Sequence, residues 1–127
     1  MSQSTNWGST FDNKQASVAG LSGSPKGMHA IAYHTSKGAA VNFTRTLASE
    51  WGRYNINVNC VCPGPTDTPL LRAVPEKHQE AFVKSTPMRR LAKPSELADA
   101  VLFFASDQAS FVTGQVLSVS GGLTLAG

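Results

Sequence analysis

A tyrosine and a lysine four positions apart, Tyr33 and Lys37 in the stretch "YHTSK", place a phenol and an ammonium in a segment with few other charges. On a helix, residues four apart lie one above the other on the same face, so both side chains would point into one space. A free phenol titrates at about pH 10, and a neighbouring cation favours its phenolate form. The pair could therefore exchange a proton with a bound hydroxyl group, although the pattern alone also suits an ordinary surface pair.

The segment that carries this pair is typical of a helix. From Ala30 onwards, apolar residues recur close to the spacing of a buried helical stripe, and Gly52 is expected to end the helix. The expected stripe consists of Ile31, Ala39, Ala40, Phe43, Leu47 and Trp51.

The next apolar run, Val58 to Cys62, is short, β-branched and broken by Pro63 and Gly64, which predicts a buried strand that ends in a sharp turn. In an open α/β sheet, ligands bind just beyond the carboxyl ends of such strands. Two hydroxyl side chains, Thr66 and Thr68, follow the turn, and Gly64 would let a ligand approach the backbone. Turn capping is the alternative role for both threonines.

A second helix and a last strand are expected in the C-terminal part. The helix opens with a proline and a serine, carries Glu96 in its first turn, and has an expected apolar face of Leu97, Val101, Leu102 and Phe104. Val116 and Val119 alternate with polar residues, as in a strand. The order helix, strand, helix, strand predicts an α/β fold.

Three separated motifs in this order resemble the C-terminal half of the short-chain dehydrogenase/reductase family, from about Ser17 to the end. They are Tyr-x-x-x-Lys at Tyr33 and Lys37, "NVNCVCPG" at 57–64 and "FVTGQVLSVSGG" at 111–122. The middle is similar to gluconate 5-dehydrogenase-like members, and the end to 2-hydroxycyclohexanecarboxyl-CoA dehydrogenase-like members. The resemblance implies the C-terminal part of a Rossmann-like, doubly wound parallel sheet in an NAD- or NADP-dependent oxidoreductase. Its substrate would be a small secondary alcohol or ketone.

The resemblance also implies roles for individual residues. Tyr33 would exchange the substrate's proton, and Lys37 would hold the nicotinamide ribose and favour the phenolate, as would a cationic nicotinamide. A serine would hold the substrate oxygen: Ser17 in "ASVAG" matches best, with Ser22 and Ser24 as rivals. The residues implied in cofactor binding are Tyr33, Lys37, Pro63, Gly64, Thr66 and Thr68.

The cofactor-binding half of the family has no counterpart in the sequence. No Gly-rich dinucleotide loop follows a strand, and the residue that would select NAD or NADP is missing. Residues 1–16 are polar where the family has a buried strand, so we expect them to be disordered or non-native and 17–127 to form a partial catalytic domain. On its own the chain should be inactive and bind either cofactor weakly. The alternative function is a non-catalytic remnant that associates with itself.

Composition excludes several other classes. A net charge of +3 with 15% charged residues gives no indication of nucleic-acid binding, and no run is apolar enough for a membrane span or signal peptide. We therefore expect a cytoplasmic protein. A homo-oligomer is a separate expectation. The histidines lack metal-ligand spacing, and Cys60 and Cys62, facing one side of a strand, suit small buried hydrophobes. The cluster Arg89, Arg90 and Lys93 is expected to be solvated, and Leu70 to Met88 resembles the family's mobile, substrate-covering helical lid.

Overall fold

The structure is a computed structural model that describes residues 30–124. Helices and strands follow one another as expected for an α/β fold. The elements are α2 (Ile31–Trp51), η2 (Gly52–Tyr54), β1 (Cys60–Pro63), α3 (Pro69–Arg72), α4 (Glu76–Ser85), α5 (Pro94–Ala105), η3 (Asp107–Ala109) and β2 (Val116–Val119). Residues 1–16 and the three candidate serines Ser17, Ser22 and Ser24 lie outside the described residues.

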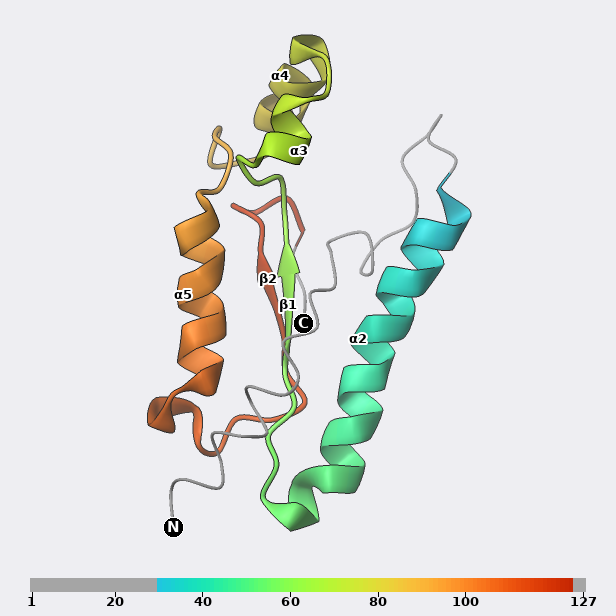
Figure 1. The fold of residues 1–127 in the computed structure, drawn as a ribbon, viewed down its shortest axis with the longest axis vertical. Coiled ribbons are helices and arrows are strands. Elements are labelled where there is room, and N and C mark those ends of the chain that lie inside the picture. Colours follow the sequence, from blue (N-terminus) through green and yellow to red (C-terminus); the bar gives the residue numbers. More distant parts are fainter. Residues whose placement is uncertain (1–29, 125–127) are drawn as a thin grey trace.

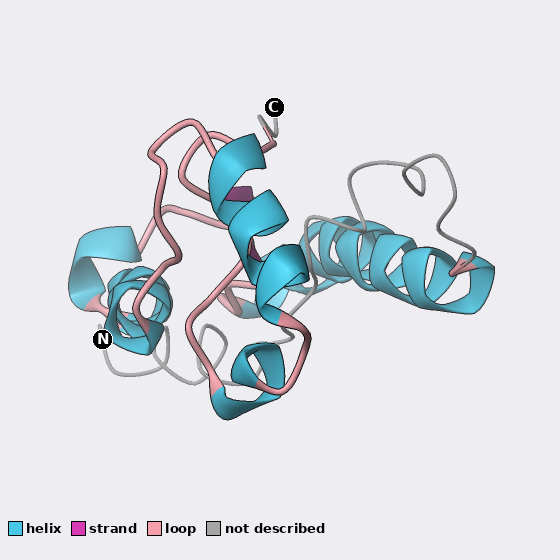
Figure 2. Cartoon of the chain, turned by 90° about the horizontal axis from the view of Figure 1, so that it is seen from above, coloured by secondary structure: helices cyan, strands magenta, loops and turns pink. Residues whose placement is uncertain are grey.

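The two strands form a parallel sheet between two helices. Cys60 pairs with Val116 and Pro63 with Val119. Helix α2 lies on one side of the strands and α5 on the other, and the view from above also shows helices on both sides of the strands (Figures 1 and 2). The fold is thus a Rossmann-like α/β arrangement with parallel strands, as predicted.

Alternation along β1 explains the two packing interfaces. Successive strand residues point to opposite faces, so Cys60 and Cys62 pack with Val41 of α2, whereas Val61 packs with α5. Both thiols are buried and free of disulfides. A hydrogen bond with Cys60, together with burial, raises the pKa of the Cys62 thiol. Neutral, buried thiols agree with the prediction that these cysteines act as small hydrophobes.

Helix α2 packs through a face that overlaps the predicted stripe only in part, since Ala40 packs against the core and Leu47 and Trp51 are partly buried. Its buried residues are Val41, Thr44 and Ala48, while Ile31 is 82% and Phe43 46% exposed. Thr44 tolerates complete burial because its hydroxyl donates to the carbonyl of Ala40 at 2.9 Å. The helix ends as predicted, with Gly52 as its C-cap, and a short 3-10 turn follows that is capped by Asn55 at φ 59°.

Helix α5 confirms the predicted start and most of the predicted face. Pro94 opens the helix, and Leu97 and Phe104 are buried against Val61. Leu102 was expected in the core but is 69% exposed. It lies off the row at i, i+3, i+4 and i+7 that Leu97, Ala100, Val101 and Phe104 form.

Two buried asparagines hold the chain that leads into β1. The predicted strand began at Val58, but the ladder begins at Cys60. Asn57 donates through Nδ2 to the carbonyls of Ala109 and Ser110, both at 3.2 Å. Asn59 donates to the carbonyl of Val112 at 3.0 Å and accepts from the amide of Gln115 at 3.1 Å. These hydrogen bonds hold the segment before β1 against the segment before β2. The sequence did not predict them.

Purified alone, the chain is expected to self-associate. Large apolar side chains are exposed on α2 and α5, and among residues 30–124 β1 pairs with β2 alone, leaving an open edge. Sedimentation velocity should detect species larger than the monomer, and fewer of them when Phe43 and Leu102 are both changed to glutamine. A monomer with a sharp thermal transition and dispersed side-chain signals would contradict the prediction.

Candidate active site

Tyr33 and Lys37 lie together on the first turns of α2, as their spacing predicted. The Lys37 Nζ atom is 5.6 Å from the centroid of the Tyr33 ring. The Tyr33 ring is half exposed, and the His34 ring meets it edge-on, with 6.0 Å between centroids. This end of α2 lies toward the carboxyl end of β1 (Figure 1). The phenol and the ammonium are therefore close enough to act on one another and remain accessible from outside.

The turn after β1 is shaped by a close approach within the chain. A Cβ atom added to Gly64 would lie 2.8 Å from the Cα atom of Ser120 and 2.9 Å from its Cβ. The Gly64 amide also donates to the carbonyl of Val119 at 3.0 Å. The sequence predicted that a ligand would approach the backbone at Gly64. In the structure, the segment after β2 makes such an approach.

Both threonines of the turn serve their own backbone. Thr66 donates through Oγ1 to the carbonyl of Gly64 at 2.9 Å. Thr68 is the N-cap of α3, and its Oγ1 accepts from the amide of Leu71 at 3.2 Å. Capping is the alternative role that the sequence left open. It leaves the hydroxyl hydrogen of Thr68 able to donate to a ligand.

A cluster of three hydroxyls beside this turn was missed by sequence reasoning. Ser118 donates to Ser120 at 3.0 Å, and its oxygen lies 3.0 Å from Thr124 Oγ1. Ser120, which is buried, accepts from the Thr124 amide at 3.2 Å. The alternation of serines in "SVSGG" was the available signal, because residues two apart on a strand share a face. The cluster fixes Ser120 where it meets Gly64.

The basic cluster before α5 is exposed to solvent, as predicted, and Arg90 also pairs with Glu96. Arg90 makes a two-pronged contact with Glu96, from Nη1 to Oε1 at 2.6 Å and from Nη2 to Oε2 at 2.9 Å. The Lys93 amide donates to the same carboxylate at 2.9 Å. Glu96 thus caps the helix and holds Arg90 in an exposed ion pair that the sequence had not indicated.

Acid is expected to loosen the start of α5. The hydrogen bonds from Arg90 and from the Lys93 amide lower the pKa of Glu96 from 4.5 to about 2. Since the folded-state pKa is the lower one, this contact stabilises fully above about pH 4.5 and is lost as the pH falls through 2. Amide exchange in the first turn of α5 should quicken over that range, and in Glu96→Gln it should not depend on pH beyond the intrinsic rate. Equal acid responses in both proteins would assign the loss to other carboxylates.

The described residues show neither a metal-ligand cluster nor a membrane-spanning helix. Between residues 30 and 124, no three His, Cys, Asp or Glu side chains gather as they would around a metal ion. In the same part of the chain, no helix has the length and apolar character needed to cross a membrane.

Tyr33 and Lys37 thus lie accessible at the end of α2 that is on the same side of the molecule as the carboxyl ends of the strands, where ligands bind in open α/β sheets. A sequence model of the family described as enoyl-(acyl carrier protein) reductase matches residues 14–124. The chain belongs to the short-chain dehydrogenase/reductase family, as its motifs predicted.

Individual relatives agree with this assignment. The 3-oxoacyl-(acyl-carrier-protein) reductase of Thermotoga maritima is 41% identical over 110 residues, which are 87% of this chain and 44% of the relative. A 3-oxoacyl-(acyl-carrier protein) reductase from Brucella melitensis, solved with bound NAD, is 44% identical with a TM-score of 0.75, covering 88% of this chain and 40% of that one.

A candidate 2-deoxy-D-gluconate 3-dehydrogenase from Agrobacterium tumefaciens, solved with bound NADP, is 30% identical with a TM-score of 0.80. The match covers 86% of this chain and 44% of that one. The chain thus spans less than half the length of each of these proteins, and both cofactors occur among the solved ones.

Proposed function

We propose that the protein acts in an NAD(P)-dependent oxidoreductase that interconverts a small secondary alcohol and the corresponding ketone. The observation that carries the proposal is the Tyr33–Lys37 pair, with its ammonium 5.6 Å from the centre of the phenol ring, at the end of α2 that lies toward the carboxyl ends of the strands. Family membership supports the same chemistry.

In this proposal Tyr33 exchanges the proton of the substrate oxygen. Its ring is half exposed, so a substrate can reach the hydroxyl. The Lys37 ammonium lies 5.6 Å from the centre of the same ring. Ser17 would hold the substrate oxygen, with Ser22 and Ser24 as the alternatives that the sequence leaves.

The donors at this edge fit the nicotinamide end of a dinucleotide. Lys37 would hold the ribose, while Thr66 and Thr68, after Pro63 and Gly64, would contact the carboxamide or phosphates. The spare hydroxyl hydrogen of Thr68 is the observation that suits such an acceptor. When bound, the nicotinamide supplies or accepts the hydride.

A chimeric enzyme tests the proposal. The amino-terminal part of the Thermotoga maritima reductase, up to its point of alignment with Ser17, would be fused to residues 17–127 of this chain. We expect ketone-dependent oxidation of the reduced cofactor and assembly into a cytoplasmic homo-oligomer. A folded chimera that binds cofactor yet turns over no ketone or alcohol would overturn the proposal and favour the non-catalytic alternative.

A further inference from the structure

The chain between β1 and α5 leaves the sheet and returns to the point where it left. Thr66 and Ala92 form a parallel bridge, in which the Ala92 amide donates to Pro65 at 2.9 Å and the Asp67 amide donates to Ala92 at 2.8 Å. We call this bridge the neck and residues 68–85 the lid. The lid holds α3 and α4, has no buried residue in either helix, and lies beyond the carboxyl end of β1 (Figure 1).

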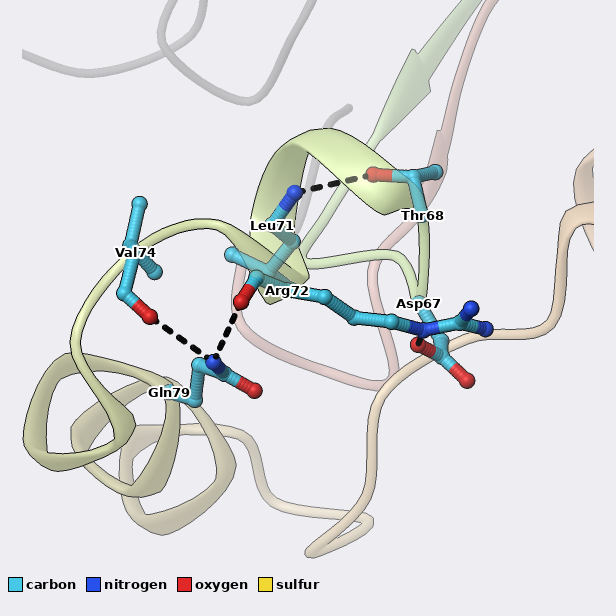
Figure 3. A network of polar contacts seen from close by, with 6 residues as sticks. All are labelled: Asp67, Thr68, Leu71, Arg72, Val74 and Gln79. Carbon is cyan, nitrogen blue, oxygen red and sulfur yellow. Dashed lines mark hydrogen bonds and ion pairs between the residues drawn. The ribbon is translucent and has the colours of Figure 1, made fainter.

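One side chain joins the two lid helices. Gln79 of α4 donates through Nε2 to the carbonyl of Val74 at 2.9 Å and to that of Arg72 at 3.3 Å (Figure 3). Both carbonyls lie at or just beyond the end of α3, where a helix leaves its last carbonyls without intrahelical partners. Gln79, a residue of α4, therefore caps the carboxyl end of α3.

The other polar contacts of α3 connect it to the neck. Thr68 caps its first turn, and Arg72 donates through Nε to Asp67 at 2.8 Å (Figure 3). The side chains of Arg72 and Asp67 are 63% and 46% exposed, so solvent weakens their attraction. A helix of four residues is not stable by itself. The two bonds from Gln79 therefore add polar links from α4 to the end of α3, beside the packing of the two helices.

We propose that Gln79 is a positioning residue that joins α3 and α4 into one body, so that the lid moves about the neck as a unit. Packing supports this, because α3 makes more contact with α4 than with any other element. The inference rests on the proposed function in one respect, namely that the lid covers the substrate. The joining of the two helices does not depend on it.

Hydrogen exchange on the folded chimeric enzyme, which carries residues 17–127 of this chain, tests the joining directly. The amides of Arg72, Ala73 and Val74 bond within the lid and report on α3. In the unaltered chain they should exchange through the same opening as the amides of α4, with the same dependence on denaturant. In Gln79→Met, which keeps the length of the side chain and removes the donor, we expect α3 to exchange about tenfold faster and separately from α4.

Two further variants serve as controls. Gln79→Lys keeps a donor of similar reach and should restore most of the protection of α3. Glu80→Gln alters the exposed neighbour on α4 and should change nothing. Separate openings of α3 and α4 in the unaltered chain, no effect of Gln79→Met, or an equal loss of protection in β1 would each overturn the proposal.

The chimeric enzyme separates this inference from the proposed function. There, Gln79→Met should raise the KM for substrate more than it lowers kcat, because a loosened lid weakens binding and leaves Tyr33 in place. An effect on kcat alone would overturn the role in positioning. A chimera without any activity would count against the proposed function, and the exchange experiment would then decide on Gln79.

Discussion

Replacing Tyr33 by phenylalanine in the chimeric enzyme is expected to lower turnover by about 10²- to 10⁴-fold, the usual contribution of general acid–base catalysis. The change removes the hydroxyl that exchanges the proton and keeps the ring beside Lys37 and His34. Affinity for the cofactor should change little, because the ammonium proposed to hold the ribose remains. Steady-state kinetics and a cofactor titration measure the two effects separately.

The second tyrosine of the chain provides a matched control. Tyr54 lies just beyond the far end of α2, with its ring 60% exposed beside Arg53. Tyr54→Phe removes the same hydroxyl group from a site with no proposed role, so turnover should be unchanged. If Tyr33→Phe keeps turnover within about tenfold of the parent, the assignment of Tyr33 as acid and base is wrong.

The sequence predicted those features of the structure that depend on residues close together in the chain. The four-residue spacing of Tyr33 and Lys37 placed them on one helix face, and the alternation of Cys60 and Cys62 placed both thiols on one side of β1. The proline and Glu96 marked the start of α5, because caps use residues within one turn. In each case the interacting groups are no more than four residues apart.

Contacts between distant segments could not be predicted in this way. Apolar periodicity favoured Ile31 and Phe43 as the packed face of α2, yet the sheet takes Val41, Thr44 and Ala48. The contact between Ala48 and Gly114 shows the reason. A Cβ atom added to Gly114 would lie 3.4 Å from the Cβ atom of Ala48. Small residues of α2 face the sheet where the segment before β2 comes close to the helix. The hydrophobicity of the sequence alone does not show how close two segments will lie.

The candidate site also has features that the sequence predicted and features that it did not. The sequence marked Thr66 and Thr68 as hydroxyls after a strand, but both a cap and a ligand contact suit that position. The hydroxyl cluster around Ser120 and the hydrogen bonds of Gln79 form because the fold brings separate segments of the chain together. No local sequence pattern predicts such an approach. Gly64 combines both cases: its turn was predicted, whereas the segment that approaches it was not.

A substitution at Gly64 is therefore expected to have the largest effect on stability. In Gly64→Ala the new Cβ would lie 2.8 Å from the Cα atom of Ser120, a backbone atom that cannot rotate away. Ser120 is held by its bonds with Ser118 and Thr124, and the Gly64 amide by its bond to Val119. Overpacking of this kind costs about 1–3 kcal/mol, which a lower urea midpoint of the chimeric enzyme should report.

Gly52→Ala is the matched control for this substitution. A Cβ at Gly52 would meet no atom within 4 Å, and its φ of −56° and ψ of −36° suit alanine. The free energy of unfolding should stay the same or rise by about 0.4–1 kcal/mol, because alanine restricts the unfolded chain. Both variants add one methyl group, which is crowded at Gly64 and free of contacts at Gly52. If Gly64→Ala proves as stable as Gly52→Ala, the segment after β2 does not approach Gly64 as described, and the hydroxyl cluster does not hold Ser120 in place.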